Sequence, residues 1–217
     1  MKDHNYRSFS SLLLFIVKLC LITCSLSMAM TTNAKETQPL KPADLVKKAV
    51  DDITTELRAN SEYYKNNPKE LQAMVDQRTS LYFNFYRMTQ IAAARYWRSA
   101  SDQQKTDLTH EFKTQLLRTY SQTLLLYRNT DSEILSEQVN DKGRVSVKLQ
   151  VKNDRGQPTL LFLLMEKNQD QWQIIDVNVE GVSIVITARG RFSEEVDKKG
   201  LDGFIDSLRE ENQRLAP

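Results

Sequence analysis

The chain has 217 residues and carries 30 lysines and arginines against 28 aspartates and glutamates. Three of those cations and one of those anions lie in the first 34 residues, so the rest of the chain has 27 charges of each sign and no net charge. A neutral protein has no bulk electrostatic attraction to nucleic acid, and we expect no nucleic-acid partner. Both cysteines, Cys20 and Cys24, also lie in this first segment, which excludes a disulfide framework or a thiolate zinc site beyond it.

Residues 1–34 have the order of a secretory signal peptide. Lys2 and Arg7 precede an apolar stretch at 12–26, and small residues follow it. The stretch is short for a membrane span and Lys18 interrupts it, which favours a cleaved leader over a permanent anchor. The sequence therefore predicts an exported protein.

Small residues place the cleavage site of this leader after Ala29 or Ala34. Lipidation of Cys24 is a minor alternative, because the residue before it, Thr23, is a poor match for that processing. Residues 35–42 are polar and contain two prolines, so we expect a tether there, followed by one domain over residues 43–212.

Helical periodicity fills the chain from residue 43 to about residue 127. Pro42 suits the first turn of one helix, Pro68 opens a second, and a third stretch runs from about residue 83 to 98. Ser101 then caps a long helix, with Gln104 in the capping-box position. The apolar stripe of this helix consists of Leu108, Phe112, Leu116, Tyr120, Leu124 and Tyr127.

The period changes to two near residue 132. Residues 145–151 alternate between apolar and polar, and further strands are expected at 134–139, 159–165 and 172–179, joined by short turns. A closing amphipathic helix contains Leu201, Phe204, Ile205 and Leu208. Helices followed by consecutive strands predict an α+β fold, with the helical N-terminal half packed on a four-stranded antiparallel sheet.

Groups able to carry catalysis or bind a metal are scarce after the leader. His110 stands alone beside Glu111 on a polar helical stretch, which is typical of a solvated side chain. Asp176 and Glu180 are best interpreted as acceptors of backbone hydrogen bonds at a strand end. A hydrolase built on Ser183 is a weak alternative, since no histidine lies near it in sequence to activate it. We expect neither an enzyme nor a metal site.

An excess of apolar residues is the informative feature of the strand at 159–165. Residues 160–165 are apolar without a break, so both faces of the strand are apolar. A central strand buried on both sides explains this pattern, and on composition alone it is the favoured interpretation. The alternative is that one face lines a cavity for an apolar ligand.

Several short motifs follow one another along nearly the whole exported part. They are Val75-Asp76-Gln77, Leu81-Tyr82, Tyr96 to Ser101 with Gln104, the aromatic spacing Phe112, Tyr120 and Tyr127, Trp172 with Asp176 and Glu180 to Ser183, and Gly200 to Gly203. In this order they resemble the motifs of the MlaC and toluene-tolerance auxiliary family of periplasmic phospholipid carriers. The chain departs from the family pattern at Leu81, where a proline is common, and at Ala94, where a glycine is common. It also departs in the strand at 159–165, which usually alternates with polar residues.

The resemblance implies an α+β fold related to the NTF2-like architecture, with a phospholipid as cargo, no cofactor, and a periplasmic location. It implies an apolar pocket between the sheet and the helices that holds the acyl chains. The side chains expected to contact lipid are Val75, Tyr82, Phe85, Ile91, Val145, Val147, Leu149, Val151, Leu161, Leu163, Ile175, Val177 and Val179.

Two docking partners are also implied, for a protein expected to act as a monomer. They are a lipoprotein–porin complex at the outer membrane and an MCE-type ABC transporter at the inner membrane. A basic cluster of Arg189, Arg191, Lys198 and Lys199 is the candidate docking surface. The alternative function is a non-enzymatic NTF2-like envelope adaptor with a filled core.

Overall fold

The computed structural model describes residues 39–216, in which helices precede strands as the sequence predicts. The predicted signal peptide, its cleavage sites and residues 35–38 of the predicted tether lie outside the described residues, and Pro42, the last residue of that tether, already belongs to the first described helix. The helices before the sheet are α2 (Pro42–Ala59), α3 (Ser61–Asn66), α4 (Pro68–Thr79), α5 (Phe85–Ala93) and α6 (Asp102–Leu124), with the 3-10 helices η1 (Ala94–Arg98) and η2 (Leu125–Tyr127).

Local sequence signals explain where these helices begin. Pro42 and Pro68 occupy the first turns of α2 and α4. The capping box at α6 is confirmed, because Ser101 Oγ accepts the Gln104 N–H and the Gln104 side chain accepts the Ser101 N–H. The predicted helix at 83–98 is shorter than expected: Ala94 has a φ of 49°, which ends α5 and turns the chain into η1.

Five antiparallel strands follow in sequential order, so the predicted meander is confirmed. They are β1 (Glu133–Val139), β2 (Val145–Lys152), β3 (Pro158–Asn168), β4 (Gln171–Val179) and β5 (Val182–Ser183). The sequence did not predict β5, which is only two residues long. Glu180 and Gly181, with φ of 51° and 93°, form the two-residue turn before it, in which both residues need a positive φ.

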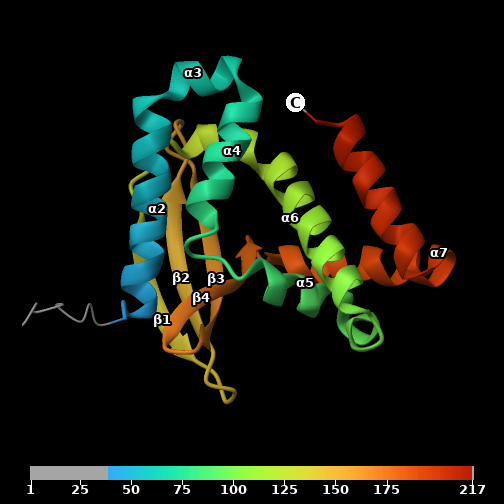
Figure 1. Cartoon of the computed structure of the whole chain (residues 1–217). Coiled ribbons are helices and arrows are strands. Elements are labelled where there is room, and N and C mark those ends of the chain that lie inside the picture. Colours follow the sequence, from blue (N-terminus) through green and yellow to red (C-terminus); the bar gives the residue numbers. More distant parts are fainter. Residues whose placement is uncertain (1–38, 217) are drawn as a thin grey trace, which may run out of the picture. The chain divides into compact units, whose positions relative to one another are not determined.

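The last helix, α7 (Ile184–Arg214), is bent at Gly200, where a φ of 73° interrupts the helical backbone. Its second limb returns alongside α6 (Figure 1). Phe192 and Phe204, one from each limb, pack edge-on, and Phe112 of α6 packs edge-on against Phe192. None of the helices in residues 39–216 is long and apolar enough to cross a membrane.

Three apolar clusters form the core of this part of the chain. One joins α5, α6 and α7, and a second joins α2, α3, α4 and the C-terminal half of α6. The third joins α2 to the sheet, where Leu45, Val46 and Ala49 pack against strand residues. Only part of the predicted stripe on α6 is buried: Leu108 and Phe112 are in the core, whereas Tyr120 is 41% exposed.

Candidate functional site

One face of the sheet is apolar on β2 to β5 and carries the exposed Glu137 at its β1 edge, and it is the face that α2 covers. We call it the inner face. Directly opposite residues of antiparallel strands share a face, so the pairing register defines its members. One row across the sheet is Val139, Val145, Met165 and Ile174; a second is Glu137, Val147, Leu163 and Val177; a third is Ile134, Leu149, Leu161, Val179 and Val182.

Burial decreases from β2 toward β5 in the second and third rows, whereas Val145, Met165 and Ile174 of the first row are all buried. α2 lies along β1 and β2 (Figure 1), and Val147 and Leu149 beneath it are both 0% exposed. On the other side of the sheet's centre, Leu161, Val177 and Val179 are only half-buried, and Val182 is 61% exposed. The helices therefore leave one part of the apolar surface incompletely covered, namely Leu161, Val177, Val179 and Val182.

The register brings eight of the nine predicted strand residues together. Seven of them belong to the three rows, and Val151 lies opposite Thr159 on the same face of β2 and β3. Ile175 requires a correction. Met165 pairs with Ile174 and Leu164 with Asp176, so Ile175 is the extra residue of a β-bulge and falls outside the inner-face register. The bulge hides this from the sequence, because alternation through residues 175, 177 and 179 looks unbroken.

The helical residues predicted to contact lipid are divided among the clusters. Tyr82 packs with the inner face, whereas Val75 lies in the cluster of α2, α3, α4 and α6. Phe85 and Ile91 pack against the cluster of α5, α6 and α7. Ile134, Met165, Ile174 and Val182 are inner-face residues that the sequence did not identify. Alternation along β3 places Met165 on the same face as Leu163, so Met165 could have been predicted from the sequence. Nothing in the sequence marks the two-residue strand that carries Val182.

A polar contact joins α2 to the buried Tyr82. The Tyr82 hydroxyl donates to the Asp52 carboxylate, which also accepts a hydrogen bond from Lys48 at 3.0 Å. Partial burial favours the protonated acid, but the hydrogen bonds from Tyr82 and Lys48 outweigh it and lower the pKa of Asp52. The contact therefore holds α2 over the inner face most strongly when Asp52 is ionised.

We expect this contact to make part of the folding stability depend on pH. Because the folded-state pKa of Asp52 is below its unfolded value of about 3.9, the contribution is complete above that value and is lost as pH falls through the folded pKa. A Tyr82→Phe variant should lose about 1–2 kcal/mol of unfolding free energy at pH 7 and less in acid. Denaturant titrations at pH 7 and pH 3 measure this difference. Tyr86→Phe is the control, since Tyr86 is exposed and packs edge-on against Trp97. If the free energy of unfolding lost in Tyr82→Phe is as large at pH 3 as at pH 7, the contact does not depend on ionised Asp52.

The residues that suggested chemistry have structural roles. Ser183 Oγ donates to Asp176 and accepts the Ile186 N–H, so it caps α7. Asp176 also accepts the Val185 N–H, and Glu180 accepts the Leu160 N–H, as the sequence predicts. His110 is exposed on α6. Over residues 39–216 no group of three or more His, Cys, Asp or Glu side chains is arranged to hold a metal ion.

A hollow of about 320 Å³ lies between α4 and α6, away from the inner face. Its lining includes the polar side chains of Lys69, Gln72, Asp76 and Thr114 beside Leu117. A mixed lining of this kind is unsuited to a long acyl chain, since the polar groups would lose water without gaining partners. The inner face is therefore the better candidate for an apolar ligand.

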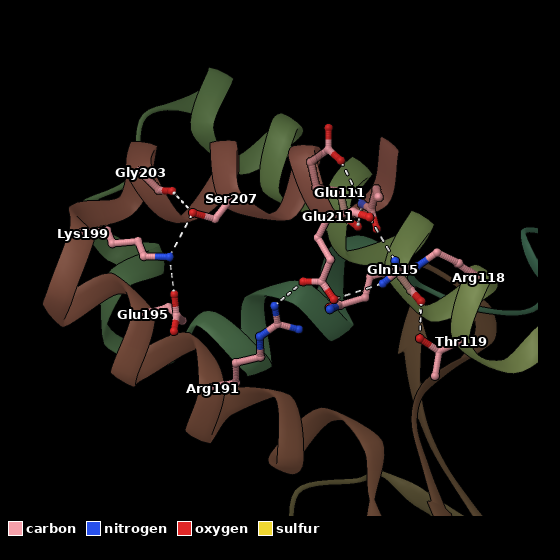
Figure 2. Close-up of polar contacts among 11 residues, drawn as sticks. Glu111, Gln115, Arg118, Thr119, Arg191, Glu195, Lys199, Gly203, Ser207 and Glu211 are labelled. Carbon is pink, nitrogen blue, oxygen red and sulfur yellow. Dashed lines mark hydrogen bonds and ion pairs between the residues drawn. The ribbon is translucent and has the colours of Figure 1, made fainter. Parts of the chain in front are cut away.

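Each residue of the predicted basic cluster has a partner within α7 or its neighbours. Arg191 and Arg118 pair with the Glu211 carboxylate, at 2.5 and 3.2 Å, and Lys199 pairs with Glu195 at 2.7 Å. Figure 2 shows these residues between the two limbs of α7 and α6. Burial acts to raise the pKa of Glu211, but the two guanidinium groups lower it overall. Arg189 donates to the Ile91 carbonyl oxygen, and Lys198 pairs with Glu194. Both arginines therefore stabilise helix packing, and Lys199 also donates to Ser207 on the second limb of α7 at 3.1 Å. Lys198 forms an exposed pair with Glu194, one turn before it.

An α+β domain that turns an apolar, incompletely covered sheet face toward its helices has the architecture of a binding protein for an apolar ligand. Comparison with known proteins agrees with this class. The model of the MlaC protein family matches residues 47–210. This protein therefore belongs to the MlaC family.

Individual relatives support the assignment. Toluene tolerance protein ttg2D of Pseudomonas putida is 26% identical over 76% of this chain and 78% of its own length. The intermembrane phospholipid transport system binding protein MlaC of Haemophilus influenzae is 23% identical over 94% of this chain and 92% of its own. A phospholipid-binding protein from Ralstonia solanacearum, solved in complex with a phospholipid, is 29% identical with a TM-score of 0.75, and the match covers 82% of this chain and all of that one.

Proposed function

We propose that this protein is a periplasmic carrier that holds a phospholipid by its acyl chains on the inner face and shuttles it between the two membranes. The inner face carries the proposal: its apolar rows run across the sheet, and the helices cover them only in part. Proteins of the MlaC family are lipid carriers and not enzymes. The phospholipid complex of the Ralstonia solanacearum relative supports a phospholipid as the cargo.

Physical chemistry explains why such a carrier needs an apolar face and no catalytic group. Exposing an acyl chain of about 15 methylenes to water costs on the order of 12 kcal/mol, at ~0.8 kcal/mol per methylene. A carrier replaces the hydrocarbon of the membrane with its own apolar side chains. The direction of transfer then follows from which partner binds the lipid more tightly, without any bond being made or broken.

The observation that tests this function is lipid bound to the purified protein. We expect native mass spectrometry of gently purified exported protein to show an added mass of lipid size, and organic extraction to yield a diacyl phospholipid. The alternative, an adaptor with a filled core, predicts folded protein without lipid. Repeated absence of lipid from folded protein would contradict the carrier function.

We also propose a cellular location and partners for the carrier. The predicted signal peptide supports export, and the name of the Haemophilus influenzae relative supports membership of an intermembrane transport system. We place this protein in the periplasm as a monomer. Its proposed partners are a lipoprotein–porin complex at the outer membrane and an MCE-type ABC transporter at the inner membrane.

Docking to these partners is proposed to involve the basic cluster of Arg189, Arg191, Lys198 and Lys199. Lys198 is the best probe, because both arginines stabilise helix packing and Lys199 joins the two limbs of α7 through Ser207. Lys198 is 59% exposed and pairs with Glu194 four residues before it. A cation at such a position steers association with an acidic partner, and salt weakens the effect.

We expect Lys198→Glu to lower capture by the purified inner-membrane transporter, most clearly at low salt, while bound lipid is unchanged. Lys47→Glu is the matched control, since Lys47 on α2 is 57% exposed and also forms an i,i+4 pair, with Asp51. Surface plasmon resonance at two salt concentrations measures the difference. Equal capture of the two variants would assign the cluster to ordinary solvated surface.

A further inference from the structure

One row of the inner face runs from covered core to open solvent. It crosses all five strands through Ile134, Leu149, Leu161, Val179 and Val182. Leu149 is 0% exposed, Leu161 and Val179 are half-buried, and Val182 is 61% exposed. An apolar path therefore leads from beneath α2 to the surface at β5.

The geometry of the β4–β5 turn explains why this end of the row stays open. β5 has only two residues, and the chain then enters α7, whose N-terminus is fixed by the bond from Ser183 to Asp176. Val185 is turned into the cluster of α5, α6 and α7 and is 0% exposed, whereas Val182 remains on the inner-face side. The helix that follows therefore buries its own apolar residue and leaves Val182 uncovered.

The opposite end of the inner face also has an exposed valine, but no open path leads to it. Val139 on β1 is 69% exposed. Its neighbours across the sheet, Val145 and Met165, are 2% and 0% exposed, so the core closes directly behind it. The two valines are therefore both exposed, but only Val182 of the two is continuous with half-buried apolar residues of its row.

We infer that Val182 is the port through which the acyl chains of the phospholipid enter and leave the inner face; this inference rests on the proposed function. A chain that slides along Leu161, Val179 and Val182 keeps apolar contact until it meets the hydrocarbon of an acceptor. The cost of exposing methylenes to water is then avoided during transfer. Val182 accordingly determines the rate of lipid exchange more than the amount of lipid held.

The experiment compares charged variants at the two exposed valines, with Val182→Asp and Val182→Lys set against Val139→Asp and Val139→Lys. Each protein is loaded with a fluorescent phosphatidylethanolamine, and its transfer to neutral phosphatidylcholine vesicles is followed. Bound lipid is counted by native mass spectrometry. We expect both Val182 variants to keep their lipid and to transfer it about tenfold more slowly, because a charge is placed on the apolar path.

Val139 lies at the sheet edge, beyond the buried Val145 and Met165 and outside the half-buried part of the inner face that is proposed to contact the acyl chains, so the Val139 variants should transfer lipid at the rate of the unmodified protein. Equal rates for the Val182 and Val139 variants would overturn the port. A loss seen with only one sign of charge at Val182 would also overturn it, since electrostatics of vesicle contact would then be responsible. Failure of the proposed function is distinct from both outcomes, because the unmodified protein would then neither hold lipid nor transfer it.

Discussion

We expect a Leu161→Glu variant to fold but to lose its bound phospholipid. Leu161 is half-buried at the centre of the third row, between Leu149 and Val179. Its carboxylate would remain near water in the lipid-free protein, but an acyl chain lying over it would desolvate the charge. That desolvation costs several kcal/mol, which is sufficient to prevent stable binding.

The neighbouring residue on the same strand provides the control. Phe162 points to the opposite face, where it pairs with Lys148 and Asn178 and the Lys148 ammonium lies 5.5 Å from its ring. Phe162→Glu therefore introduces the same charge one position away and should leave lipid binding intact. Organic extraction and native mass spectrometry of both variants make the comparison. Full lipid occupancy in folded Leu161→Glu would place the acyl chains elsewhere.

A Val147→Glu variant is expected to be destabilised severely rather than merely emptied of lipid. Val147 is 0% exposed and packs in the cluster that joins α2 to the sheet. A charge there has no route to water unless α2 moves away, so we expect a loss on the order of 4 kcal/mol or more of unfolding free energy. Denaturant titration followed by circular dichroism measures it.

Ser146→Glu is the matched control for this substitution. Ser146 is adjacent in β2 and half-buried on the opposite face, opposite Gln138 and Leu164. Its replacement should change the unfolding free energy by about 1 kcal/mol or less. Loss of lipid from a Val147→Glu protein of normal stability would show that α2 is held less firmly over β2 than its packing indicates.

These two variants separate parts of the inner face that the sequence treats as equal. Val147 lies in a strand that alternates between apolar and polar residues, and Leu161 lies in a strand that is apolar throughout residues 160–165. Both were predicted to contact lipid. The structure makes one a core residue and the other a half-buried surface residue. Which of two strands a helix covers depends on the packing of residues far apart in sequence. The apolar pattern within a strand carries no information about that packing, so it cannot distinguish Val147 from Leu161.

The sequence by itself determined the α+β order, the helix starts at Pro42, Pro68 and Ser101, and the antiparallel meander. These features depend on short-range signals: proline in a first turn, a capping box, and alternation between turns. The roles of Asp176 and Glu180 as acceptors of backbone hydrogen bonds were also predicted, although their donors, Val185 and Leu160, lie nine and twenty residues away and are brought to them by the fold.

Only the tertiary structure decided which apolar residues form one continuous face and where that face is open. The bulge at Ile175 shifts the register of β4, so Ile174 joins the inner face although strict alternation selects Ile175. The position of Val182 at the end of a row depends on a strand too short to leave a period in the sequence. Both follow from pairing between strands, whose register is set by partners outside the segment and therefore cannot be derived from the segment alone.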